Sequence, residues 1–157
     1  MNKKGIKIAA VIVIVLGVIF VIYKYMSYKE YVPSNDEIAL HIQLDTKEDI
    51  GLIVYDYEIG NQKYSAGIAN ADRSLIKHDS DNIVVWNKNE LNNISDPFEL
   101  SMKLRIITEY VPPNFENVYP DNITKHIDPI SLKLEFGKSY FITITGDNIN
   151  GYRAILK

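Results

Sequence analysis

An unbroken apolar run near the N-terminus constrains the fold of this chain more than any other feature. Every residue from 8 to 23 is apolar, small or aromatic, and Ile6 extends the run beyond a single charge at Lys7. At a helical rise of about 1.5 Å per residue, residues 6–23 span about 27 Å, close to the thickness of a bilayer's hydrocarbon layer. A soluble domain of only about 125 residues could hardly bury such a helix on every side. The run therefore predicts a transmembrane helix over residues 6–26.

The alternative is a cleaved secretory signal, which also begins with basic residues and an apolar stretch. Such signals have a shorter apolar stretch, of roughly 7 to 15 residues, and a small-x-small cleavage site. Here the run passes into Tyr23, Lys24 and Tyr25 without an Ala-x-Ala pattern, which favours an uncleaved signal anchor. A lipid-modified N-terminal cysteine is excluded because the chain has no cysteine. Cleavage would leave a secreted domain.

The charges that flank the run predict its orientation. Three lysines precede it and two follow it: Lys3, Lys4, Lys7, Lys24 and Lys29. Because positive charge is retained on the cytoplasmic side, residues 1–5 are expected in the cytoplasm. A juxtamembrane linker is then expected at residues 27–36 and an extracytoplasmic domain at residues 37–157. The prediction is a single-pass protein of the cell membrane that contacts the lipid bilayer through its N-terminal helix and has its C-terminal domain outside the cell.

Acidic and basic residues are divided unevenly along the chain. Five of the 17 Lys and Arg precede Glu30 and none of the 20 Asp and Glu does, which leaves 12 basic against 20 acidic residues, a net charge of −8. Nucleic-acid phosphates and anionic lipid head groups repel a domain this acidic, so neither is expected as its partner. The abundance of Ile, Asn and Lys is typical of proteins from low-GC Gram-positive bacteria. A bacterial cell envelope is therefore the expected setting.

From residue 37 onward the apolar residues recur with a period of two, as in β-strands with one buried face. Residues 38–44 alternate in this way, and residues 50–58 are richer in β-branched and aromatic side chains. The second stretch predicts a more central strand. Gly60-Asn61 then predicts the turn of a hairpin with residues 62–69.

Five further stretches carry strand signals: residues 83–86, 98–106, 130–136, 140–144 and 151–156. A loop of about 15 residues is expected around Pro112-Pro113, and Gly137-Lys138 predicts a tight turn between the strands beside it. Seven or eight strands at short spacing predict an all-β domain, a single antiparallel β-sandwich that is Ig-like in general architecture. A small barrel is the alternative.

The reactive side chains show no recognisable catalytic or metal-binding spacing. His41, His78 and His126 are far apart, and the chain has neither cysteine nor a Gly-x-Ser-x-Gly elbow. The sequence therefore indicates no catalytic residue, no metal ligand and no cofactor. The alternative is a cell-envelope hydrolase or metal-dependent enzyme. It requires at least two of these histidines, with carboxylates, to converge in a concave pocket.

Aromatic residues around the long loop are the candidate binding residues. Tyr110, Phe115 and Tyr119 flank Pro112-Pro113. Exposed rings on a loop suit stacking on sugars or anchoring a protein partner. The competing interpretation is that these rings cover the open end of the sandwich. Trp86 lies in a stretch that is apolar on both faces and is expected in the core.

Together these features favour a non-catalytic binding or scaffolding module at the cell envelope. An envelope protein or a cell-wall glycan is the expected partner, and nucleic acid is not. A contiguous exposed apolar or aromatic patch of more than a few hundred Å² would distinguish such a module, because free monomers seldom show one.

Overall fold

The structure is a computed structural model that describes residue 13 and residues 15–20, 31–114 and 116–157. The chain divides into two compact units, Met1–Tyr31 and Val32–Lys157. In the first unit, Val13 and residues 15–20 are helical. No helix within the described residues has the length and apolar character needed to cross a membrane. Most of the transmembrane helix predicted at residues 6–26 lies outside the described residues.

The regular secondary structure of the second unit is almost entirely β-strand. Within the described residues there are nine strands and one short 3-10 helix: β1 (Glu37–Thr46), β2 (Leu52–Ile59), β3 (Gln62–Ile68), β4 (Asp81–Asn87), β5 (Phe98–Ile107), η1 (Asp121–Ile123), β6 (Thr124–His126), β7 (Ile130–Leu134), β8 (Lys138–Asp147) and β9 (Gly151–Leu156). Each of the eight stretches that the alternation indicates contains a strand, which confirms an all-β domain. The ninth strand, β6, is short and was not predicted.

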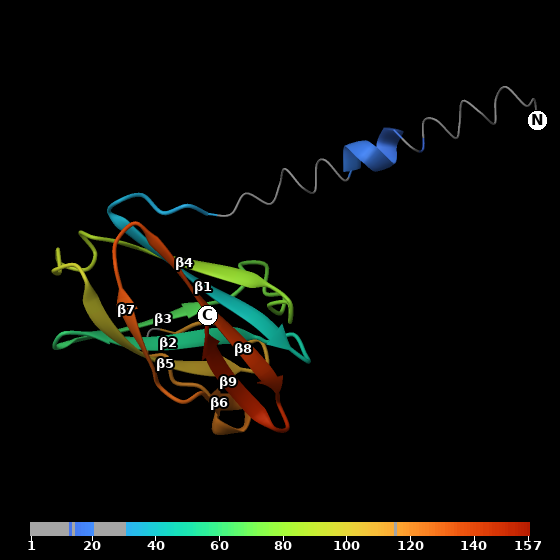
Figure 1. Cartoon of the computed structure of the whole chain (residues 1–157). Coiled ribbons are helices and arrows are strands. Elements are labelled where there is room, and N and C mark those ends of the chain that lie inside the picture. Colours follow the sequence, from blue (N-terminus) through green and yellow to red (C-terminus); the bar gives the residue numbers. More distant parts are fainter. Residues whose placement is uncertain (1–12, 14, 21–30, 115) are drawn as a thin grey trace, which may run out of the picture. The chain divides into compact units, whose positions relative to one another are not determined.

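The strands form two sheets (Figure 1). One, here called the β1 sheet, has the order β4-β1-β8-β9, and the other, the β2 sheet, has the order β3-β2-β5-β6 with β7 also paired to β5. The prediction of a purely antiparallel arrangement is wrong at one place, because β1 and β8 pair in parallel. Parallel pairing needs a long connection, and here the whole β2 sheet is built from the chain between these two strands.

Alternation along the strands puts one face of each sheet into a shared core. In β5, Leu100, Met102 and Leu104 are buried, whereas the residues between them are exposed or only partly buried. In β1, Ile38 and Ile42 are likewise buried and belong to the same hydrophobic cluster. Because strand side chains alternate between the two faces, the remaining residues of each strand form the outer face of its sheet.

The turns around the strands match the prediction in one case and differ in another. Gly60, at a φ of +60°, starts the two-residue turn that joins β2 to β3 as an antiparallel hairpin, as predicted. Gly137, at a φ of +78°, also makes a tight connection. It does not make a hairpin, because β7 pairs with β5 whereas β8 pairs with β1 and β9. This turn carries the chain from one sheet to the other.

The long loop after β5 folds back over the outer face of the β2 sheet. Leu52 and Val54 point outward there and form a second buried cluster with Ile107, Tyr119 and Ile123. This cover explains why β2 is apolar on both faces over its first half, the pattern that predicts a central strand. As predicted, β2 lies between β3 and β5.

Candidate functional site

The aromatic residues predicted to bind a partner occupy different environments. Tyr119 is buried in the cluster under the long loop, and its hydroxyl accepts a hydrogen bond from the backbone amide of Asn114 at 3.2 Å. Tyr110 is half-buried just after β5. Phe115 lies outside the described residues. Tyr119 therefore packs the loop onto the outer face of the β2 sheet.

The three histidines lie on separate elements, and two of them pair with one carboxylate each. His41 Nδ1 in β1 is 2.8 Å from Asp81 Oδ2, and His78 Nδ1 is 2.9 Å from Asp49 Oδ1. His126 is exposed in β6 of the other sheet. Nowhere in the described part of the chain do three or more His, Asp or Glu residues gather in a way that could hold a metal ion. The convergence that the metal-enzyme alternative requires is not found there.

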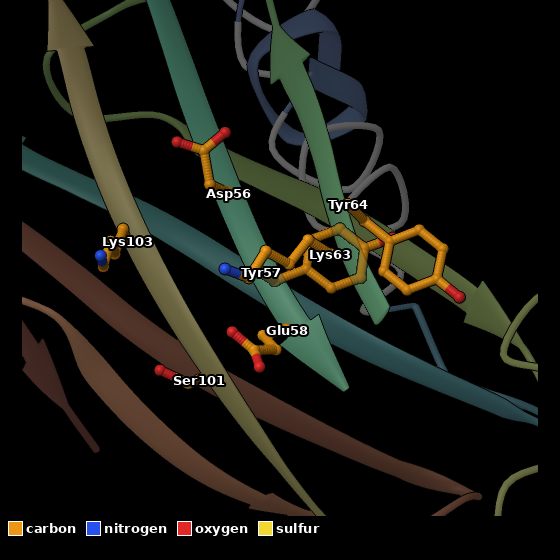
Figure 2. A pocket seen from close by; sticks show the side chains of 7 residues that line it. All are labelled: Asp56, Tyr57, Glu58, Lys63, Tyr64, Ser101 and Lys103. Carbon is orange, nitrogen blue, oxygen red and sulfur yellow. The ribbon is translucent and has the colours of Figure 1, made fainter. Parts of the chain in front are cut away.

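A shallow depression of about 130 Å³ lies on the outer face of the β2 sheet. Figure 2 shows Asp56 and Glu58 on β2 with Lys103 and Ser101 on the neighbouring strand β5. The strand register places Glu58 opposite both Lys63 and Ser101, and Asp56 opposite Lys103. Carboxylates and amines thus alternate across this face, so that each charge has a neighbour of opposite sign.

A hydrogen-bond network next to the depression fixes the long loop. Arg105 donates from Nη2 to Asp56 at 3.0 Å and from Nη1 to the carbonyl oxygen of Asn117 at 2.7 Å. The Asn117 side chain donates to the hydroxyl of Ser65 at 2.7 Å, and that hydroxyl donates to Asp56. These charged groups are therefore engaged in holding the structure together. The depression itself is open, and none of the residues that line it is a histidine that could activate Ser101.

The outer face of the β1 sheet differs because much of it is apolar. Ile38, Leu40 and Ile42 point into the core, so Ala39 and His41 point outward. The register places Ile83 of β4 and Phe141 of β8 on either side of His41, with Val85 and Ile155 on the adjacent rows. Ile83, Val85 and Ile155 are 42%, 36% and 42% exposed. We define the outer apolar face by its side chains: Ala39, His41, Ile83, Val85, Phe141 and Ile155.

His41 lies at the centre of the outer apolar face and is itself only 1% exposed. Its ring stacks on Phe141 with 4.4 Å between ring centroids, and Nδ1 pairs with Asp81. The other ring nitrogen, Nε2, is buried without a hydrogen-bond partner among the described residues. An unsatisfied buried polar atom costs roughly 1–3 kcal/mol, so native folds contain few of them. The outer apolar face thus combines the exposed side chains of Ile83, Val85 and Ile155 with a buried histidine nitrogen, His41 Nε2, that has no hydrogen-bond partner among the described residues.

The sequence of β4 predicts burial where the structure shows an exposed face. Residues 83–86 are apolar at four consecutive positions, which indicates burial on both sides of a strand. The structure buries Trp86, as predicted, but leaves Ile83 and Val85 exposed. The cause is that β4 is an edge strand, with nothing in the described part of the chain layered over its outer side.

Two carboxylates that pair with basic side chains, Asp147 and Asp49, predict how stability depends on pH. Asp147 accepts hydrogen bonds from Lys47 and from the backbone amide and side chain of Asn150, and these hold the pKa of its carboxyl well below the ordinary value. Lys77 and His78 do the same to the pKa of Asp49. Below about pH 4, the ordinary aspartate pKa, the unfolded chain therefore binds more protons than the folded one, and stability falls with falling pH.

Urea unfolding measured from pH 5 down to pH 2.5, a range that crosses the ordinary aspartate pKa of about 4, is the check. The midpoint of the wild-type chain is expected to fall steadily over this range. Asp147→Asn should start lower at pH 5, because it loses the charged interaction with Lys47, and should fall less steeply. Parallel curves for the two proteins would contradict the assignment to Asp147.

Comparisons with known proteins do not place the chain in a family. No family model matches it, and no curated protein matches it in sequence. Similar solved structures include pneumolysin, at 11% identity over 77% of this chain and 23% of that chain with a TM-score of 0.39. Listeriolysin O matches at 8% identity over 77% and 22% with a TM-score of 0.39. The membrane-binding domain of pneumolysin matches at 9% identity over 77% and 96% with a TM-score of 0.36. The chain spans about a quarter of the length of the whole toxins that it matches.

Proposed function

We propose that this chain is a single-pass membrane-anchored protein whose residues 37–157 act as a non-catalytic β-sandwich binding module outside the cell membrane. The apolar run supports the anchor, because every residue from 8 to 23 is apolar, small or aromatic, as a lipid environment requires of a spanning helix. The N-terminus is assigned to the cytoplasm on the charge bias of the flanking lysines.

The single observation that carries the binding role is the outer apolar face of the β1 sheet. Ile83, Val85 and Ile155 lie on two strands of the same face, with Phe141 and His41 between them. Exposed apolar side chains gathered on one face are a feature of protein–protein contact sites, although the row that carries Ile155 also carries the polar side chains of Thr143 and Gln43. The outer face of the β2 sheet, in contrast, is charged and its groups are paired with one another. The first face is therefore the better binding surface.

An envelope protein fits this surface better than a cell-wall glycan does. Aliphatic side chains gain by excluding water against other apolar groups. Sugar recognition relies on open aromatic rings together with hydrogen-bonding side chains. On the outer apolar face the aromatic ring, Phe141, is half-buried and stacked on His41. We therefore propose a protein partner that lies close to the membrane.

Lysine on the outer apolar face is expected to abolish partner binding. Ile83→Lys and Ile155→Lys each place a charge where a partner would bury an apolar side chain, so crosslinking to the partner should fall at least about tenfold. The measurement is lysine crosslinking in intact cells that express the full chain at native level, followed by purification and mass spectrometry.

Ile149→Lys is the matched control, because Ile149 is 93% exposed in the turn between β8 and β9 and lies off the face. It should retain the wild-type crosslinks. Equal loss in all three variants, or no loss in any, would contradict the assignment of the face. The intact mass of the purified chain tests the anchor at the same time, because removal of the first 25 or so residues would show a cleaved signal.

A further inference from the structure

Strand β4 has a free edge whose backbone groups can be assigned individually. It is the terminal strand of the β1 sheet and pairs with β1. Two backbone hydrogen bonds flank β4. The amide of Leu44 donates to the carbonyl oxygen of Ser80 at 2.8 Å, and the amide of Lys88 donates to the carbonyl oxygen of Asp36 at 2.8 Å. Hydrogen-bonded pairs alternate in an antiparallel ladder, so the even-numbered residues of β4 bond to β1. The odd-numbered residues direct their amides and carbonyls to the free edge.

Three residues of this edge have backbone groups available for pairing. The odd-numbered residues are Asp81, Ile83, Val85 and Asn87, but Asn87 is already engaged by Glu90. Its amide donates to Glu90 Oε2 at 3.1 Å, and its carbonyl accepts from the Glu90 amide at 2.9 Å. Within the described part of the chain, the amides and carbonyls of Asp81, Ile83 and Val85 face no other strand. The available set is centred on Ile83.

The β4 edge carries one charged side chain, the carboxylate of Asp81, but lacks the other features that normally keep edges apart. Soluble proteins protect edge strands with charged side chains, lysine above all, and with proline, bulges or short length. The other outer strands each carry a cation: Lys63 in β3, Lys125 in β6, Lys133 in β7 and Arg153 in β9. β4 has the sequence DNIVVWN, without Lys, Arg, Pro or Gly, and its register against β1 runs unbroken over seven pairs. This edge is a template for another strand.

We propose that β4 pairs antiparallel with β4 of a second copy of this chain, about a two-fold axis at Ile83. In this register Ile83 faces Ile83 and Asp81 faces Val85. Every available amide and carbonyl of one edge then meets one of the other, which no other antiparallel register achieves. β-Branched side chains also meet side by side on the outer face, a favourable cross-strand pairing. The two β1 sheets become one continuous sheet.

The charges at the ends of β4 favour this arrangement over a parallel one. Parallel pairing in register would set Asp81 beside Asp81. In the antiparallel register the two Asp81 side chains lie four residues apart along the strand, about 14 Å, beyond the screening length at physiological salt. In the same register Asp79 of one copy lies near Asn87, the last residue of β4 in the other copy. Lys88 follows Asn87 directly, so a negative and a positive charge come close together at each end of the paired strands. This complementarity between the two ends argues for a second copy as the occupant.

The absence of cysteine makes single-cysteine crosslinking a direct test. Residues opposite each other in a hydrogen-bonded antiparallel pair have Cα atoms about 5.5 Å apart, within the range that a disulfide bridges. Oxidation of the full-length Ile83→Cys chain, purified in detergent, should give a covalent dimer. Ile149→Cys, exposed but away from the edge, should stay monomeric. Equal dimer yield from both variants would show random collision and overturn the proposal.

Light scattering on the same preparations measures the association without a crosslink. At about 100 µM the wild-type chain should be dimeric, because a strand-paired dimer with a micromolar dissociation constant is populated there. Val85→Lys should weaken the dimer at least about tenfold, since lysine on an edge opposes pairing. Fluorescence of Trp86 verifies that the variant is folded. A monomeric wild-type chain that gives no Ile83→Cys dimer would overturn the proposal.

The dimer goes beyond the proposed function and can fail separately from it. Strand pairing uses the β4 edge, whereas Ile155, which is 42% exposed, lies on β9 at the opposite edge of the sheet. A partner crosslinked in cells to a chain that is monomeric when purified would leave the proposed function intact and refute the dimer. A purified dimer without a crosslinked partner protein in cells would support the dimer and refute the proposed function.

Discussion

Replacing Gly51 with alanine is expected to destabilise the domain by more than about 4 kcal/mol, a large part of the total stability of a typical domain. A Cβ atom at this position would lie 1.8 Å from the carbonyl oxygen of Glu109 and 2.6 Å from the amide nitrogen of Tyr110. Both are backbone atoms, so no side-chain rotation relieves the clash. Gly51 also donates its amide to the carbonyl of Ile107 at 2.8 Å, which holds the two segments together.

Chemical unfolding followed by the fluorescence of Trp86, the only tryptophan, measures this effect. Gly60→Ala is the matched control because it is the same substitution at a turn with no neighbouring atom within 4 Å. That variant has to hold a φ of +60° and should lose only about 1 kcal/mol. If Gly51→Ala unfolds at the same denaturant concentration as Gly60→Ala, the backbone of Glu109 and Tyr110 does not lie against Gly51.

Trp86→Ala is expected to destabilise the domain by about 3–5 kcal/mol, the usual cost of truncating a large buried aromatic side chain. Trp86 is buried and lies 5.3 Å from Tyr57 between ring centroids, so it joins β4 of one sheet to β2 of the other. Tyr57 in turn stacks on Tyr64 of β3 with 5.0 Å between ring centroids. Burial in this cluster raises the pKa of the neighbouring Tyr55 to about 12.

Far-ultraviolet circular dichroism is the appropriate probe, since this variant removes the tryptophan itself. Trp86→Phe keeps an aromatic ring between the sheets and should lose about 1–2 kcal/mol. Equal losses for alanine and phenylalanine would mean that the ring does not pack between the sheets. A loss below about 1 kcal/mol for alanine would instead match an exposed residue.

The strands could be predicted from the sequence because alternation is a local property. Residues 98–106 alternate cleanly and form β5, and Gly60-Asn61 turns β2 into β3. The parallel pairing of β1 with β8 could not be predicted in this way. A period of two is the same in parallel and antiparallel strands, and the pairing depends on contacts between residues 100 positions apart, such as Ile42 and Ile142.

The candidate site was less accessible to sequence reasoning, for a related reason. Whether Ile83 and Val85 are buried depends on whether another element covers β4, and no pattern within the strand contains that information. The same holds for Tyr119, whose ring is buried because Leu52 and Val54 present a second apolar face beneath the loop. The consecutive apolar residues at 52–55 predict a second apolar face on this strand, but they do not predict which segment of the chain covers it.

The parallel pair β1–β8 has a consequence for the order in which the domain is made. β1 is synthesised first, yet one of its two neighbours, β8, begins only at Lys138. Until then β1 can pair with β4 alone, and its other edge lies open while the strands of the β2 sheet emerge. Long-range pairing of this kind slows folding and prolongs the exposure of unpaired strands. The growing chain therefore adds residues 47–137 before the second neighbour of β1 begins, and β1 has no neighbour at all until β4 is made. This interval is when a chaperone would be needed.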